Sequence, residues 1–280
     1  MHAALVKGST AVVTGGASGI GLTAARYLAR AGLRVCIADC NAGRIAMARQ
    51  TMIADGAAPG DVIGVPTDVA DKTQLSALAD QAFAAFGAVN VLMNNAGIQP
   101  GSDIFDAANN WDRILDVNML GVIRGVQIFA PRMIASGQPG LIINTGSKQG
   151  ITTPPGDPAY NISKAGVKVF TEALQHALRN SPGHQVEARL FIPGFVFTSL
   201  TAHGRTEKPA GAWTPEQTVD FLFQSVVRGD FYILCPDNEV DRATDEKRVR
   251  WAAGDIAENR PPLSRWHPDF ADAFKEWLNS

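Results

Sequence analysis

Tyr160 and Lys164 are the two residues whose types and spacing most directly suggest chemistry. They lie four positions apart in a segment, residues 158–180, whose apolar residues recur every three or four positions, which is typical of a helix with one buried face. The pKa of a tyrosine phenol is about 10, so the phenol is a useful base near neutral pH only where a cation favours its anion. Lys164 would supply that cation and lower the pKa of Tyr160. Taken alone, such a pair is usually a surface feature. Whether Tyr160 and Lys164 are catalytic therefore depends on which other motifs the chain contains.

A glycine-rich turn near the N-terminus predicts a phosphate site. Residues 10–14 (TAVVT) form a short apolar run typical of a buried strand, and they lead directly into residues 15–21 (GGASGIG) and an amphipathic segment, residues 22–30. Glycines let the backbone turn tightly and approach a pyrophosphate, whose charge is favoured at a helix N-terminus. An isolated glycine cluster could be no more than a turn, but the strand before it and the helix after it favour a dinucleotide site.

Asp39 indicates which dinucleotide this site prefers. It follows the apolar run 33–38, where an acidic residue accepts hydrogen bonds from the adenosine ribose and repels a 2′-phosphate. Ser18, rather than Lys or Arg, stands in the glycine turn. We therefore predict NAD as the cofactor. NADP is the less favoured alternative. It is kept because the Arg44 side chain could reach a 2′-phosphate.

The elements that must position these residues alternate along the chain. Short apolar runs and longer helical segments follow one another, as in repeated strand–helix–strand units. We expect an α/β fold in a single domain, with a doubly wound parallel Rossmann sheet of about seven strands and helices on both faces. Strands are expected at 10–14, 33–38, 62–65, 89–94, 141–145, 186–192 and 231–234. Helices are expected at 19–31, 41–55, 72–86, 104–116, 118–136, 158–180 and 215–228.

The character of the chain changes after Pro236. Residues 1–236 are expected to form the Rossmann-type, NAD-binding catalytic domain. Residues 237–260 are rich in charged side chains, and the aromatic residues Trp266, Phe270, Phe274 and Trp277 follow them. A solvated tail is one interpretation. The aromatic side chains favour another, in which the extension 237–280 packs on the core or on a neighbouring subunit.

Composition excludes several classes of function. The 280 residues are 46% hydrophobic, and 25 Lys and Arg against 27 Asp and Glu give a formal charge of -2. We therefore expect a small-molecule partner and no nucleic acid. Neither a signal peptide nor a run of about 18 apolar residues is evident, so we expect a cytoplasmic protein with no membrane partner. Three Cys and five His show no metal-site spacing, and Gln149 interrupts a G-x-S-x-G elbow, so neither a metal site nor a serine hydrolase is predicted.

Over roughly residues 8–235, the chain resembles the short-chain dehydrogenase/reductase family. The likeness rests on the glycine turn 14–21, on residues 94–97 (NNAG), on Ser147 at the family's interval before Tyr160, and on Y-x-x-x-K. With the glycine turn and Asp39, the resemblance implies cofactor contacts at Gly15, Ser18, Gly19, Ile20, Gly21, Asp39, Asp68, Val69, Asn95, Ala96, Gly97, Tyr160, Lys164, Pro193, Gly194, Val196 and Thr198.

The same resemblance implies a catalytic set of Asn118, Ser147, Tyr160 and Lys164. Tyr160 would remove the hydroxyl proton of an alcohol as hydride leaves the same carbon, and reduction would reverse both transfers. Ser147 would hold the substrate oxygen. Lys164, helped by the positive charge of an oxidised nicotinamide, would lower the pKa of Tyr160, and it would also bind the nicotinamide ribose. Asn118 would hold a water that links Lys164 to solvent.

These features together predict an NAD-dependent oxidoreductase that interconverts a secondary alcohol and a ketone. Residues 199–214 fall where the family places a mobile lid, although an ordinary exposed loop is equally consistent with them. The resemblance also implies a homotetramer or dimer, with contacts through 104–136, 158–180 and the last strand. One alternative is a non-catalytic NAD-binding sensor or scaffold, which has no reason to keep the catalytic set. The other is a sugar-nucleotide epimerase or dehydratase, which would need a larger C-terminal substrate domain.

Overall fold

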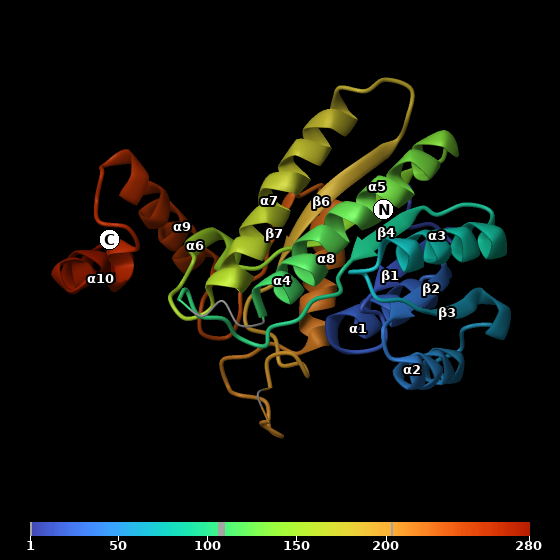
Figure 1. Cartoon of the computed structure of the whole chain (residues 1–280), viewed down its shortest axis with the longest axis horizontal. Coiled ribbons are helices and arrows are strands. Elements are labelled where there is room, and N and C mark those ends of the chain that lie inside the picture. Colours follow the sequence, from blue (N-terminus) through green and yellow to red (C-terminus); the bar gives the residue numbers. More distant parts are fainter. Residues whose placement is uncertain (1, 106–109, 203) are drawn as a thin grey trace.

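A single seven-stranded parallel sheet forms the centre of the computed structural model, which describes residues 2–105, 110–202 and 204–280 (Figure 1). The strands are β1 (Thr10–Thr14), β2 (Arg34–Asp39), β3 (Val62–Pro66), β4 (Val91–Asn94), β5 (Gly140–Thr145), β6 (Val186–Ile192) and β7 (Tyr232–Leu234). They lie in the order β3-β2-β1-β4-β5-β6-β7, and every neighbouring pair is parallel. The direction of winding reverses between β1 and β4, where such sheets bind ligands. The predicted doubly wound Rossmann fold is confirmed.

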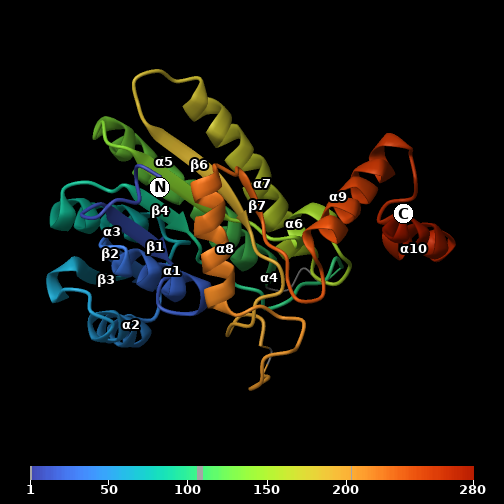
Figure 2. The same ribbon diagram turned by 180° about the vertical axis from the view of Figure 1, so that it is seen from behind.

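Helices cover both faces of the sheet, as Figures 1 and 2 show from opposite sides. One layer consists of α1 (Gly19–Arg30), α2 (Ala42–Ala54) and α8 (Pro215–Arg228), and the other is built from α3 (Lys72–Phe86), α5 (Gly121–Ala135) and α7 (Pro158–Arg179). Successive residues of each strand face opposite layers. On β1, Ala11 and Val13 pack under α1 and α8, whereas Val12 packs with the α3 and α5 layer. Both faces are therefore buried, which explains the continuous apolar runs.

One helical stretch corrects the sequence prediction. The helices expected at 104–116 and 118–136 are continuous, because α4 (Asn110–Leu115) runs through the π turn η2 (Asp116–Leu120) into α5. Residues 106–109 of the first expected helix lie outside the described residues. Among the described residues, Asn110–Ala135 is one helix long and apolar enough to cross a membrane by length and composition, although charged residues interrupt it and it holds no unbroken run of about 18 apolar residues. Its buried residues, including Phe129, pack on the sheet as a core helix does.

Beyond β7, the charged segment is mostly helical. It forms α9 (Arg242–Ala257), the short 3-10 helices η3 (Ser264–Trp266) and η4 (Pro268–Phe270), and α10 (Ala271–Asn279), which extend away from the body of the molecule (Figure 1). Trp251 packs edge-on against Phe274 with ring centroids 5.2 Å apart, and Arg260 lies over the Trp251 ring. The aromatic residues of the extension therefore pack largely with one another.

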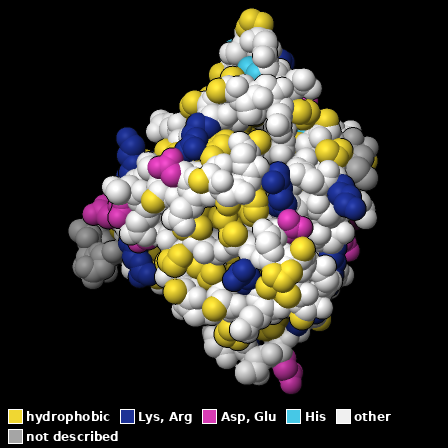
Figure 3. Space-filling view, turned by 90° about the vertical axis from the view of Figure 1, so that its right-hand side faces the viewer, with side chains coloured by type: hydrophobic (Ala, Val, Ile, Leu, Met, Phe, Trp, Pro, Cys, Tyr) yellow, Lys and Arg dark blue, Asp and Glu magenta, His cyan; other side chains and the backbone are white. Residues whose placement is uncertain are grey.

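On the surface shown in Figure 3, the described residues form no patch of a single charge sign. Lys and Arg side chains are interspersed there with Asp and Glu and with scattered apolar groups. Nucleic acid binding requires a continuous basic surface, and the face shown in Figure 3 does not present one among the described residues. The mixture agrees with the formal charge of -2.

Candidate active site

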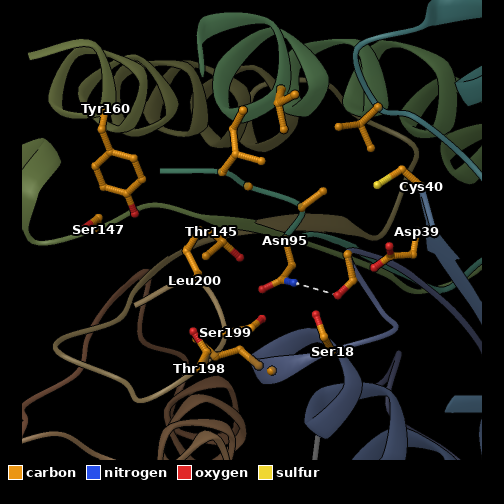
Figure 4. Close-up of a pocket in the computed structure, with 18 of the residues that line it drawn as sticks. Ser18, Asp39, Cys40, Asn95, Thr145, Ser147, Tyr160, Thr198, Ser199 and Leu200 are labelled. Atoms are coloured by element: carbon orange, nitrogen blue, oxygen red, sulfur yellow. Dashed lines mark hydrogen bonds between the residues drawn. The ribbon is translucent and has the colours of Figure 1, made fainter. Parts of the chain in front are cut away.

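A cavity of about 790 Å³ opens at the carboxyl ends of the strands, at the point where the winding of the sheet reverses (Figure 4). Its volume is within the usual range for cofactor sites. Most predicted site residues line it: Gly15, Ser18, Gly19, Ile20, Asp39, Asp68, Val69, Asn95, Ala96, Gly97, Ser147, Tyr160, Lys164, Pro193, Gly194, Val196 and Thr198. Gly21 and Asn118 do not line the cavity. Gly21 packs against Gly15 and Asn95, and the Asn118 side chain lies next to Gly97.

The glycine turn leaves room for a phosphate group. Gly15 and Gly19 have φ angles of 62° and 51°, which favour glycine. A Cβ at Gly21 would lie 2.1 Å from the carbonyl oxygen of Gly15, so only glycine lets the turn close on α1. Ser18 precedes α1 in an extended conformation, and its side chain makes no capping hydrogen bond. The first amide groups of α1 are therefore available to an anion, and the turn fits a pyrophosphate.

The β4 end of the cavity is held against β1 by hydrogen bonds. Thr14 Oγ1 accepts from the backbone amides of Asn95 and Ala96 (3.0 and 3.2 Å), and the Asn95 side chain donates to the Thr14 carbonyl (3.2 Å). Behind them, Asn94 donates to Asn144 Oδ1 on β5 (2.8 Å). Thr14 is thus an organising residue whose role the sequence reasoning missed.

Asp39 lies at the opposite end of the cavity from Tyr160 (Figure 4). It ends β2, and its Oδ1 accepts a hydrogen bond from the backbone amide of Asn41 (3.1 Å). Asn41 in turn caps α2 by accepting from the amide of Arg44 (2.9 Å). The carboxylate of Asp39 and the side chains of Cys40 and Arg44 all border this end of the cavity.

Three of the four predicted catalytic residues meet at the other end. Tyr160 and Lys164 lie in the first two turns of α7, and Ser147 follows β5. The Tyr160 phenol points toward Ser147 (Figure 4), whose side chain favours the phenolate and so lowers the pKa of the phenol. Lys164 Nζ lies 5.7 Å from the centroid of the Tyr160 ring and donates to the carbonyl oxygen of Thr145 (2.9 Å).

Asn118, the fourth predicted residue, is fully buried in the π turn. Its side-chain oxygen accepts from the Ile98 amide and its nitrogen donates to the Ile98 carbonyl, both at 2.8 Å. A Cβ at Gly97 would lie 3.4 Å from Asn118 Oδ1 and 3.8 Å from Lys164 Nζ. Asn118 therefore fixes the loop after β4 next to Lys164.

Burial, rather than Lys164, dominates the pKa of Tyr160 in the protein alone. Desolvation raises the pKa of Tyr160 to about 12, although the Ser147 hydrogen bond opposes the increase. Burial also lowers the pKa of Lys164 to about 8. Lys164 by itself does not lower the pKa of Tyr160 in the protein alone, so the predicted lowering stays a prediction for the complex with oxidised nicotinamide. An ammonium 5.7 Å from the ring does not offset the loss of water around the phenol.

The cavity also includes residues that sequence reasoning did not select: Thr67, Ala70, Ile98, Asp112, Arg113, Asp116, Val117, Thr145 and Gly146. Thr145 and Gly146 had a usable signal, because they join a predicted strand to Ser147. The residues on α4 had none, since only tertiary packing brings that helix to the cavity. Ser199–Thr201 begin the predicted lid, whose position 203 lies outside the described residues.

Comparisons with known proteins identify the family. The model of a family described as short chain dehydrogenase matches residues 9–209. An uncharacterized short-chain type dehydrogenase/reductase of Sinorhizobium fredii is 37% identical over 70% of this chain and 78% of its own. The 1-deoxy-11-beta-hydroxypentalenate dehydrogenase of Streptomyces avermitilis is 30% identical over 87% and 90%, respectively. The crystal structure of a short chain dehydrogenase/reductase from Burkholderia phymatum in complex with NAD superposes with a TM-score of 0.83, at 33% identity, over 94% of this chain and 98% of that one.

Proposed function

The chain belongs to the short-chain dehydrogenase/reductase family, and we propose that it interconverts a secondary alcohol and a ketone with NAD as the cofactor. One observation carries the proposal. The Tyr160 phenol points toward the Ser147 side chain at the cavity end opposite Asp39 (Figure 4), and Lys164 Nζ lies 5.7 Å from the centroid of the tyrosine ring. A site that only bound the cofactor would have no need of this arrangement.

In the proposed reaction, Tyr160 carries the proton. Bound NAD would supply the carbon that accepts or returns hydride. Ser147 holds the substrate oxygen near Tyr160 Oη, which takes the hydroxyl proton during oxidation and returns it during reduction. The raised pKa of Tyr160 keeps the phenol protonated, as the reducing direction requires. For oxidation, the Lys164 ammonium and a cationic ring in the cavity together would have to favour the phenolate.

The remaining cavity residues would hold the cofactor. The glycine turn and the uncapped amides of α1 would bind the pyrophosphate, and Asp39 would accept hydrogen bonds from ribose hydroxyls. The Burkholderia relative, whose structure contains NAD, supports this assignment. The 193–198 loop would border the nicotinamide, and residues 199–214 would form a lid over the substrate.

We expect Asp39→Ala to weaken the discrimination against NADP. Removal of the carboxylate removes its repulsion of a 2′-phosphate, while Arg44 remains beside the same end of the cavity. The ratio of the NADP dissociation constant to that of NAD should fall about tenfold or more, as measured by titration calorimetry without any substrate. Cys40→Ser, at the neighbouring position, is the control and should leave the ratio unchanged. An unaltered ratio in Asp39→Ala would remove the basis for the NAD preference.

The function itself is tested by a screen. Purified protein is incubated with NAD and a panel of secondary alcohols, and the absorbance of the reduced cofactor is followed. Because one relative is named for a hydroxypentalenate, the panel should include cyclic alcohols. We expect turnover on at least one alcohol. NAD binding with no turnover across the panel would instead favour a sensor, and conversion of a sugar nucleotide without net reduction of NAD would favour an epimerase or dehydratase.

We further propose a cytoplasmic homo-oligomer built through α7 and the last strand. Val169 on α7 and Tyr232 on β7 are large apolar or aromatic side chains with more than a third of their surface exposed. Contacts with a second subunit would cover them.

A further inference from the structure

A buried ionic cluster lies directly behind Ser147. The next residue, Lys148, places its Nζ 2.6 Å from Asp245 Oδ2 and 3.1 Å from Asp237 Oδ2. The three side chains are only 18%, 5% and 6% exposed, respectively. Asp245 belongs to the first turn of α9, and Asp237 lies between β7 and α9. Because buried charges are costly unless they are paired, the cluster holds all three segments of backbone in place.

The same cluster supports the loop predicted to border the nicotinamide. Asp237 Oδ2 accepts a hydrogen bond from the backbone amide of Phe195 (3.2 Å). A Cβ at Gly194 would lie 2.7 Å from that oxygen and 3.0 Å from Lys148 Nζ. Gly194 also lines the cavity. The 193–195 backbone therefore lies between the cavity on one side and the ionic cluster on the other.

The residue after Asp237 reaches the far end of the predicted lid. The Asn238 side chain donates to the carbonyl oxygens of Ala210 and Ala212 (2.8 and 3.1 Å), and its backbone amide donates to that of Gly211 (3.0 Å). Trp213 then pairs with the 195–197 strand segment through two backbone hydrogen bonds. The start of the C-terminal extension is thus bonded to two segments that border the cavity, at Lys148 and at Gly194–Phe195, and also to residues 210–212.

We infer that Lys148, Asp237 and Asp245 are positioning residues that set the place of the Ser147 loop and of the Gly194–Phe195 backbone, which makes the C-terminal extension a working part of the site. The identity of this end as the nicotinamide end rests on the proposed function. The cluster contrasts with the Arg242–Glu246 pair on the same helix, whose side chains are exposed and whose other polar contacts among the described residues are with Leu234 and Arg250. Glu246 therefore provides a matched control for Asp245.

The experiment compares Asp245→Asn with Glu246→Gln by calorimetry, using NAD and ADP-ribose as probes. Asp245→Asn leaves Lys148 and Asp237 as a balanced pair, so the chain should fold. We expect it to weaken NAD binding about tenfold while ADP-ribose, which lacks nicotinamide, binds within about twofold of wild type. Glu246→Gln should change neither constant. Equal weakening of both probes, or no change in either, would overturn the inference.

Hydrogen exchange provides a second readout that needs no substrate. In Asp245→Asn, amides of 146–152 and 193–200 should exchange about tenfold faster than in wild type, while those of β1–α1 should not change. Lys148→Arg, which keeps the charge, should retain more of the wild-type NAD affinity than Lys148→Met. Unchanged exchange in the two loops would contradict the inference. A wild-type protein that turns over no alcohol would contradict the proposed function alone, since both measurements remain valid without turnover.

Discussion

We expect Tyr160→Phe to lower alcohol turnover about a thousandfold, because a positioned acid or base typically contributes a factor of this order. The variant keeps the ring, which packs with Ile114 and Ala159, and loses only the hydroxyl that points toward Ser147 (Figure 4). NAD affinity and folding stability should therefore stay close to wild type. Steady-state rates with the best alcohol from the screen, together with calorimetry for NAD, measure the two effects separately.

Tyr232→Phe is the matched control for this variant. Tyr232 also has its pKa raised to about 12, through its 2.6 Å hydrogen bond to Glu172, but it lies on β7 away from the cavity. Loss of its hydroxyl should leave turnover unchanged. If Tyr160→Phe retained near-normal turnover, Tyr160 could not be the proton carrier, whatever the cofactor affinity.

Lys164→Met should combine a loss of turnover with a gain in stability. Lys164 is 4% exposed, and burial lowers its pKa from 10.5 to about 8. At pH 7 the folded protein therefore bears the desolvation of an ammonium, which methionine removes, partly offset by the lost hydrogen bond to Thr145. We expect a net increase of about 1–2 kcal/mol in the free energy of unfolding, measured by urea denaturation. Turnover should fall at least about a hundredfold, because the phenolate loses its cation.

The difference in unfolding free energy between Lys164→Met and wild type should depend on pH. Between the folded pKa of about 8 and the unfolded value of 10.5, the unfolded wild-type chain binds more protons at Lys164. Wild-type stability at this site therefore rises with pH across that window. The advantage of Lys164→Met should be full below pH 8 and should vanish above about pH 10.5. Lys168→Met, at a half-exposed surface pair with Glu172, should show no such trend. A pH-independent difference for Lys164→Met would show that desolvation of the Lys164 ammonium is not its cause.

The sheet and the cofactor turn could be predicted because their signals are local. The strands 10–14 and 186–192 and the helix 215–228 have the predicted bounds, since buried parallel strands and amphipathic helices carry distinct apolar periods. Helix α9 gave no such signal, because it is highly charged and buries only Asp245 and Trp251. The junction of α4 and α5 was misplaced because a π turn continues the helix without a break in the sequence.

The site shows the same division between local and tertiary information. The spacing of Tyr160 and Lys164 predicted their proximity, but it could not predict how deeply both are buried, and burial determines the direction of both pKa shifts. The Lys148–Asp237 pair joins residues 89 positions apart. Only the folded sheet, with β7 at its edge, brings them together.

The most direct test of the central claim follows the hydride. Wild-type protein and NAD are incubated with a secondary alcohol from the screen that carries deuterium on the carbinol carbon, and the reduced cofactor is analysed by mass spectrometry. Direct transfer predicts one deuterium in each reduced cofactor molecule and a ketone product. Unlabelled reduced cofactor, or an alcohol consumed without cofactor reduction, would contradict the proposed reaction.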